Sequence, residues 1–265
     1  PLLVTVSLIL IGLAIKSGLF PFHFWMPDTY GYATTSSAAI LSGLVSKAYI
    51  FLGIKVIFRV IGFDVVASTH ILNVLFIFGL AGIIVGSLSA IRENNINRMI
   101  AFSSAAQIGY IFVGIGTGTM AGMVAAIFQI FVHAVTKPML FISASRLVDV
   151  SGGKKQFSYL QGSAHRNRLA GFAFTVGAMS MVGIPLFGGF AAKVAFATAA
   201  VGDSKRMIPT ILVLAISTVL NTIYFLRTVM RIYMPAETAG NPVARSGNRW
   251  PFIFAVTGFA AVNIL

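Results

Sequence analysis

The stretch AMSMVGIPLFGGFAAKVAF, residues 178–196, shows most directly what kind of fold this chain adopts. It lies within an apolar run at about 169–200, whereas one straight transmembrane helix needs only about 20 residues. Gly183 and Pro185 stand near the middle of that run, where proline removes a backbone donor and glycine relaxes the backbone. We therefore predict a membrane helix that is broken at its centre.

The rest of the chain has the same apolar character. Hydrophobic residues make up 57% of its 265 positions and charged residues 9%, whereas about a quarter of a soluble domain is charged. Seven further runs are candidate membrane spans: about 2–24, which Pro21 interrupts, 33–58, 71–90, 99–117, 120–145, 208–230 and a last one starting near 250. The sequence predicts a single all-α transmembrane domain over residues 1–265, a polytopic helix bundle with broken helices, multi-pass in the cell membrane (inner or plasma membrane).

Both ends of the sequence lie inside apolar runs. Pro1 opens one run, residues 263–265 close another, and no signal peptide is visible. We expect the chain to be a fragment of a longer subunit whose N-terminal helices are missing.

Composition also excludes several kinds of site. The chain has no cysteine, which excludes disulfides and thiolate metal sites. Its four histidines and six acids show no metal-ligand spacing, and we find no Gly-rich dinucleotide loop or haem-type histidine pair. No cofactor and no metal are therefore expected, and any redox chemistry is assigned to partner subunits.

The net charge of +13 reflects membrane topology rather than binding to nucleic acid. Four basic residues lie in loops on one side: Lys55, Arg59, Lys205 and Arg206. Eleven lie in loops on the other: Arg92, Arg98, Arg146, Lys154, Lys155, Arg166, Arg168, Arg227, Arg231, Arg245 and Arg249. The positive-inside rule predicts that the second set is cytoplasmic.

Four lysines are not explained by topology, because each lies well inside an apolar run: Lys16, Lys47, Lys137 and Lys193. A lysine at the centre of a membrane helix costs about 2.5–3.5 kcal/mol on insertion scales, so each is expected to face protein or water. Burial favours the neutral amine, and such a lysine can take up and release a proton, which arginine cannot do. The alternative is snorkelling, in which the ammonium reaches the interface; it has the most weight for Lys16, near Trp25 and Asp28.

Lys137 belongs to a polar helix face. Gln129, His133 and Lys137 are spaced i, i+4 and i+8, and Thr136 and Gln107 extend the same polar path. His133 has the unperturbed pKa closest to neutrality and is the natural shuttle partner, although a histidine that only packs and hydrogen-bonds is the alternative.

Two of the lysines accompany helix breaks. Lys193 follows Gly183 and Pro185 by less than three turns, and Lys16 shortly precedes Pro21. Broken helices at mid-membrane are where ion sites form in transporters, so the pair suggests a duplicated transport unit. Pro138, directly after Lys137, either weakens its helix and admits water or forms a plain kink.

The motifs together resemble a known family, the antiporter-like membrane subunits shared by NADH:quinone oxidoreductase (complex I), Mrp-type cation/proton antiporters and membrane-bound hydrogenases. The resemblance rests on KSGLFPFHFWMPD at 16–28 with SGLVSKAY at 42–49, NRMIAFSS at 97–104 with QIGY at 107–110, His133-Ala134 with Lys137 and Leu140-Phe141, and GIPL at 183–186 with Gly189-Phe190 and Lys193. Departures are Asn95 and Asn97 in place of an Asp and a Lys, Thr34 in place of Pro, and Pro138 in place of Ala.

The resemblance implies about fourteen helices in two inverted five-helix repeats, each with one broken helix. It implies that Lys16 lies on the first broken helix and that Lys47 links the repeats. His133 and Lys137 would continue the polar axis, and Lys193 would be the exit-side group. The glutamate that pairs with Lys16 in the family would belong to the missing N-terminal part.

Function is therefore expected to be proton, or cation/proton, translocation through a relay of Lys16, Lys47, His133, Lys137 and Lys193. The expected partners are other membrane subunits of a hetero-oligomeric complex, the lipid bilayer and transported protons, with Na⁺ or K⁺ as the open alternatives and no nucleic acid. A secondary carrier of an anionic solute is one alternative, although one lysine on each of four helices fits a row better than a single site. A non-conducting membrane scaffold is the other, and it predicts that the lysines tolerate loss.

Overall fold

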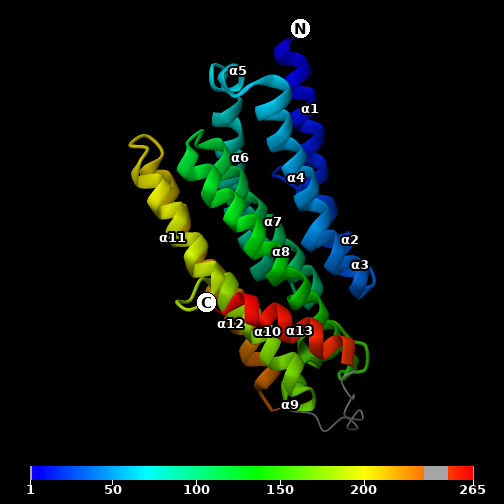
Figure 1. The fold of residues 1–265 in the computed structure, drawn as a ribbon. Helices are drawn as coiled ribbons and strands as arrows, with labels where there is room; N and C mark the ends of the chain where they lie inside the picture. The colour runs from blue at the N-terminus through cyan, green and yellow to red at the C-terminus, as the bar shows by residue number, and fades with distance from the viewer. Residues whose placement is uncertain (1, 236–249, 265) are drawn as a thin grey trace.

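A computed structural model describes residues 2–235 and 250–264 of the chain (Figure 1). Its helices are α1 (Leu2–Ser17), α2 (Trp25–Tyr32), α3 (Thr35–Ile40), α4 (Ser46–Lys55), α5 (Phe63–Ala67), α6 (Ile71–Arg92), α7 (Ile96–Gly116), α8 (Met120–Asp149), α9 (Ser163–Arg166), α10 (Arg168–Val182), α11 (Gly188–Val201), α12 (Met207–Tyr233) and α13 (Trp250–Asn263). Short 3₁₀ turns, η1 (Phe22–Phe24) and η4 (Phe157–Tyr159), and π-helices, η2 (Leu41–Val45) and η3 (Val56–Ile61), join or interrupt them.

The prediction of an all-α membrane bundle is confirmed. Six helical segments of the described chain are long and apolar enough to cross a membrane, and α10, α11 and α13 are shorter apolar helices. The run at 169–200 is divided into α10 and α11, while the run at 33–58 is one continuous helical segment, Thr35–Ile61, in which a π-helix follows α3 and another follows α4.

Three helices begin directly after a side-chain cap that lies in the short connection before them. The Asn95 side chain accepts from the backbone N–H of Asn97 (2.9 Å) at the start of α7. Thr119 accepts from Gly122 (3.1 Å) before α8, and Asn167 caps α10. These caps satisfy backbone donors that a helix leaves unpaired, so the apolar runs begin at defined residues.

Glycines bring α6 and α7 into direct backbone contact. A Cβ at Gly109 would lie 2.6 Å from the carbonyl oxygen of Gly79, and one at Gly86 would lie 2.8 Å from the Ala106 nitrogen. Membrane helices pack closely through such small residues, because lipid provides no hydrophobic drive between helices. As a result α7 is buried along almost its whole length and forms the centre of the bundle together with α8.

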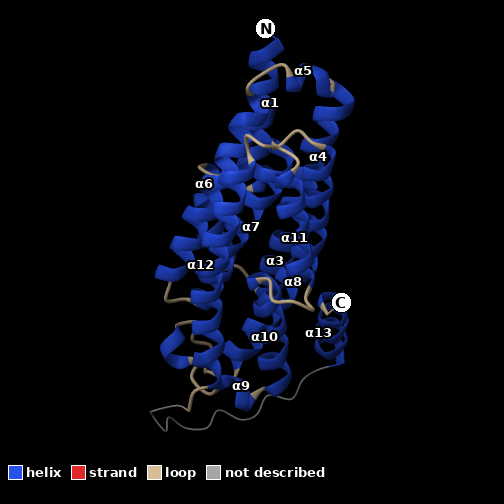
Figure 2. Ribbon diagram, turned by 90° about the vertical axis from the view of Figure 1, so that its left-hand side faces the viewer, coloured by secondary structure: helices blue, strands red, loops and turns tan. Residues whose placement is uncertain are grey.

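The basic segments at 91–98, 146–168 and 227–235, which include helix ends as well as loops, meet at one end of the bundle (Figures 1 and 2). Arg98 pairs with Asp28 and, at 3.1 Å, with Glu93. Lys155 donates to the Gly31 carbonyl (2.9 Å), and Arg227 donates to the Ile91 carbonyl (2.8 Å). The grouping of these loops agrees with the predicted topology; Arg245 and Arg249 lie outside the described residues, and the cytoplasmic orientation stays a prediction.

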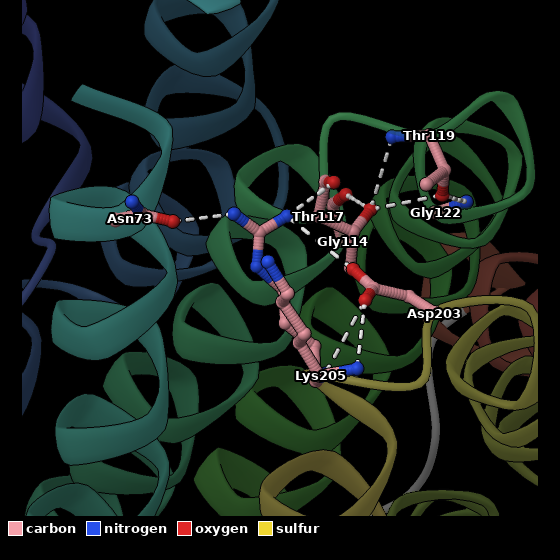
Figure 3. A network of polar contacts seen from close by, with 8 residues as sticks. Asn73, Gly114, Thr117, Thr119, Gly122, Asp203 and Lys205 are labelled. Carbon is pink, nitrogen blue, oxygen red and sulfur yellow. Dashed lines mark hydrogen bonds and ion pairs between the residues drawn. The ribbon is translucent and has the colours of Figure 1, made fainter. Parts of the chain in front are cut away.

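Arg206 organises the opposite end, where its partners Asn73, Thr117 and Asp203 lie close together (Figure 3). It donates to the Thr117 carbonyl and to the Asn73 side chain, and it pairs with Asp203 at 3.5 Å. The loop before α12 is thereby tied to α6 and to the α7–α8 turn. Arg206 thus has a structural role beyond the topological one inferred from its charge.

Candidate functional site

The break between α10 and α11 is a tight turn built around glycine. Gly183 adopts φ +85°, a left-handed conformation that favours glycine, and its N–H donates to the Met179 carbonyl (3.0 Å). Pro185 follows within the turn, and α11 begins at Gly188. At the next position, Gly189, the backbone N–H donates to the Ser180 hydroxyl (3.2 Å), so the two half-helices touch closely beyond the turn.

Lys193 returns from α11 to the end of α10. Its ammonium donates to the Val182 carbonyl (2.5 Å) and to the Thr218 hydroxyl on α12 (2.8 Å). Because α10 ends at the break, the Val182 carbonyl accepts no hydrogen bond from a helical N–H, and it accepts one from Lys193 instead. The half-buried Lys193 side chain also lines an open groove of about 590 Å³ between α11 and α12.

On α8, Gln129, His133 and Lys137 lie on one buried face, as their spacing predicts. The Lys137 ammonium donates to the Ser103 hydroxyl and to the Ile100 carbonyl (3.3 Å), both on α7. Neither ring nitrogen of His133 has a hydrogen-bond partner among the described residues. A buried polar group left unpaired costs about 1–3 kcal/mol, so a histidine held this way is unusual as a simple packing residue.

Lys47 is buried at the start of α4, directly after the π-helix η2. Its ammonium donates to the Ser42 carbonyl and to the Ser46 hydroxyl (3.1 Å). Ser42 also shares a hydrogen bond with Ser104 of α7 (3.1 Å), so the lysine is joined to the central helix. Single π turns of this kind occur frequently at functional sites, and hydropathy gave no sign of this one.

Lys47, His133 and Lys137 are close enough to interact electrostatically. No carboxylate is buried anywhere in residues 4–235 or 250–264, so the cluster has no internal counter-charge there. Within the same ranges no group of three His, Asp or Glu side chains could hold a metal ion. The structure thus brings together three of the five predicted relay residues.

α7 connects this cluster to Lys193. Ser103 contacts Lys137, and one turn further along Gln107 accepts a hydrogen bond from Gln129 (2.5 Å). Gln107 and Tyr110 then line a small enclosed space together with Lys193. Polar side chains of α7 thus lie at intervals between the two lysine positions, and Tyr110 donates onward to Ser217 of α12 (2.6 Å).

Lys16 differs from the expectation for a buried group. Its side chain is exposed on the last turn of α1, where the Trp25 indole donates to the Ile15 carbonyl (3.0 Å). Within the described chain α1 packs mainly on α4, and the face that carries Lys16 has no protein covering it. Pro21 lies in the turn that follows α1, ahead of η1. Lys16 is thus separated from the buried cluster.

Sequence reasoning missed a polar stripe on α12 and a residue on α13. The stripe is buried and consists of Thr210, Ser217, Asn221, Tyr224 and Thr228. The spacings of 7, 4, 3 and 4 residues place these side chains on one helix face, a signal that the mean hydropathy of the run conceals. On α13, Asn263 accepts from the Thr136 hydroxyl (2.6 Å), beside Lys137.

Comparisons with known proteins agree with this architecture. The profile of a family described as NADH:quinone oxidoreductase/Mrp antiporter, transmembrane, matches residues 2–221. NADH-quinone oxidoreductase subunit N of Azobacteroides pseudotrichonymphae is 34% identical over 259 residues, 96% of this chain and 52% of that protein. Subunit N of Desulforudis audaxviator is 30% identical over 250 residues, 91% of this chain and 48% of that protein.

A solved structure has the same fold. A chain of the Mrp complex from Dietzia sp. superposes with a TM-score of 0.86 at 24% identity, covering 98% of this chain and 55% of that one. The chain spans about half the length of the curated relatives it matches.

Proposed function

The chain belongs to the NADH:quinone oxidoreductase/Mrp antiporter transmembrane family, and from this premise we propose that it translocates protons across the membrane. The observation that carries the proposal is the buried cluster of Lys47, His133 and Lys137, which has no buried carboxylate in the described chain. Polar side chains of α7 lie between this cluster and Lys193. Partner subunits of a larger membrane complex would drive the transfer. Exchange of a proton for Na⁺ or K⁺ is the related possibility within the same family.

The cluster is suited to proton transfer because it has more basic sites than it can charge at once. Two ammonium groups and an imidazolium in one low-dielectric interior repel each other, so the cluster favours holding fewer protons than it has sites. Once a side-chain rotation brings an ammonium N–H of Lys137 or Lys47 to a ring nitrogen of His133, the ammonium can give that nitrogen its proton, leaving a neutral amine and an imidazolium. The imidazolium can then return a proton from the other ring nitrogen.

The roles follow from position. Lys47 would receive protons into the cluster, His133 and Lys137 would pass them, and Lys193 would release them into the groove between α11 and α12. Gly183 and Pro185 would end α10 at Val182, so that Lys193 reaches the freed carbonyl. Lys16 would act in the same row only with a partner carboxylate that comes from outside the described residues.

Substitution of the buried lysines tests the proposal in the full-length protein within its complex. Lys137→Met and Lys193→Met should abolish coupled proton transport in inverted vesicles, with assembly on native gels retained because a buried charge has been removed. Lys193→Arg should fail nearly as badly, since a guanidinium does not release its proton. Lys205→Arg and Lys205→Met, at an exposed loop position, are the matched controls and should transport normally.

The same variants separate the alternatives. A carrier of an anionic solute needs only positive charge, so Lys→Arg would partly rescue the methionine variants. In a non-conducting scaffold every lysine substitution would be mild. Normal pumping in Lys193→Arg and Lys47→Arg would defeat the proton-relay proposal even if the methionine variants are inactive.

A further inference from the structure

Two side chains of the buried α12 stripe form a hydrogen-bonded pair that contacts three other helices. The Tyr224 hydroxyl donates to the Asn221 side-chain oxygen (2.7 Å), and both residues are fully buried. The Asn221 amide nitrogen donates to the Met181 carbonyl at the end of α10 (3.3 Å), and its oxygen accepts from Ser87 of α6 (3.5 Å). The relay described above uses neither residue.

One end of this pair lies against the hydrogen-bond partner of Lys137. The Ser103 hydroxyl accepts a hydrogen bond from the Lys137 ammonium and donates to the Ile100 carbonyl (2.7 Å), and the Tyr224 side chain lies close to it. The neighbouring Phe225 ring lies 5.8 Å from the same ammonium. The face of α12 that carries Tyr224 is therefore packed directly on the Lys137 site.

The other end lies against the hydrogen-bond partner of Lys193. Met181, whose carbonyl Asn221 holds, directly precedes Val182, whose carbonyl accepts from Lys193. Thr218, one turn before Asn221 on α12, is the second acceptor for that ammonium. The α12 pair thus fixes the last turn of α10, which in turn fixes the oxygen that Lys193 binds.

We propose that Tyr224 and Asn221 are positioning residues that couple the Lys137 site to the Lys193 site across α12. The inference rests on the proposed function, because it matters only if both lysines take part in transport. Loss of a proton at Lys137 changes the charge beside Ser103 and Phe225, and the Tyr224–Asn221 pair is polarised by such a change because the interior has a low dielectric. Asn221 is not itself a proton carrier, since a side-chain amide keeps its two protons, so the pair acts by position and polarisation.

A purely structural role is the competing explanation. Buried hydrogen bonds between membrane helices are worth on average about 0.6 kcal/mol, so loss of one such bond should leave the bundle assembled. Tyr224→Phe removes only the hydroxyl, and Asn221→Leu removes both amide groups at similar volume. Thr228→Val is the matched control, because Thr228 is equally buried on α12 and its hydroxyl bonds to the Tyr224 carbonyl of its own helix.

The experiment measures proton transport in inverted vesicles from cells with the full-length protein in its complex, in H₂O and in D₂O. Tyr224→Phe should lower the transport rate roughly five- to tenfold and raise the H₂O/D₂O rate ratio, because proton transfer becomes limiting. Asn221→Leu should lose at least as much.

The outcomes separate the two proposals. If Lys137→Met and Lys193→Met transport normally, the proposed function fails and the coupling with it. If those variants are inactive while Tyr224→Phe and Asn221→Leu match Thr228→Val, the coupling alone is refuted. A Tyr224→Phe rate that falls only in proportion to the amount of assembled complex, with an unchanged H₂O/D₂O ratio, would also refute it.

Discussion

Gly189→Ala should disable the protein through the geometry of one backbone contact. A Cβ at this position would lie 1.7 Å from the Ser180 carbonyl oxygen, whereas ordinary contact begins at 3.4 Å. The start of α11 and the end of α10 would therefore have to separate by a further ~1.7 Å, which backbone atoms cannot absorb by a rotamer change. The hydrogen bond from Gly189 to Ser180 would be lost as well.

The displacement reaches the lysine. Lys193 lies one turn after Gly189 on α11, so a shift of the helix start carries its ammonium away from the Val182 carbonyl. Overpacking of this size costs about 1–3 kcal/mol of stability, which a bundle in a membrane can tolerate. Misplacement of a working group by about 1 Å can cost about a hundredfold in rate, and we expect a loss of that order in coupled transport.

Gly188→Ala is the control one residue earlier. A Cβ there meets only Val132, at 3.5 Å, which is ordinary contact. Transport in inverted vesicles should stay near the wild-type rate for Gly188→Ala and fall for Gly189→Ala, at equal amounts of assembled complex on native gels. Equal rates in the two variants would refute the reasoning that the close half-helix contact positions Lys193.

Two further predictions concern the break and the orientation of the chain. Pro185→Ala combined with Gly183→Ala should favour a continuous helix and lower transport, while the amount of protein in the membrane is unchanged; unaltered transport would mean that the break serves packing alone. A Cys introduced at Ser204 should react with a membrane-impermeant maleimide added outside the cell, and one at Ser158 should not, because the two exposed positions lie at opposite ends of the bundle. The reverse labelling pattern would overturn the assigned orientation.

The sequence alone predicts a feature correctly where one residue type determines the local backbone conformation. Gly183 and Pro185 predict a broken run because their effects are local, and the structure has α10 and α11 on either side of them. The buried face of α8 follows from helical periodicity alone, because residues spaced by four lie on one side. The all-α bundle follows from length and hydropathy.

Features that depend on neighbouring helices were not predictable. The π-helix before Lys47 is packed through Gly43 against Pro138 of α8, where a Cβ on the glycine would lie 2.4 Å from the proline ring. That contact joins residues far apart in sequence, so no local sequence pattern predicts it. The exposure of Lys16 has the same origin, because hydropathy places a residue along a span but does not say which face has a neighbour. Asn221 and Tyr224 were hidden for a different reason, since single polar residues hardly change the average over a long apolar run.

The distance along α7 between the levels of Lys137 and Lys193 makes proton transfer between them sensitive to the membrane voltage. Ser103 marks the level of Lys137 on this helix and Tyr110 the level of Lys193, and seven residues of α-helix rise about 10 Å. With α7 along the membrane normal, that is roughly a third of a hydrocarbon core about 30 Å thick. Moving one elementary charge across the whole membrane changes its free energy by about 2.3 kcal/mol per 100 mV. Movement across this third of the membrane therefore changes the free energy of the proton by roughly 0.8 kcal/mol per 100 mV. The rate of proton passage between the two lysines would therefore depend on the membrane voltage as well as on chemistry, and a membrane potential set against the flow would act directly on this interval of the bundle.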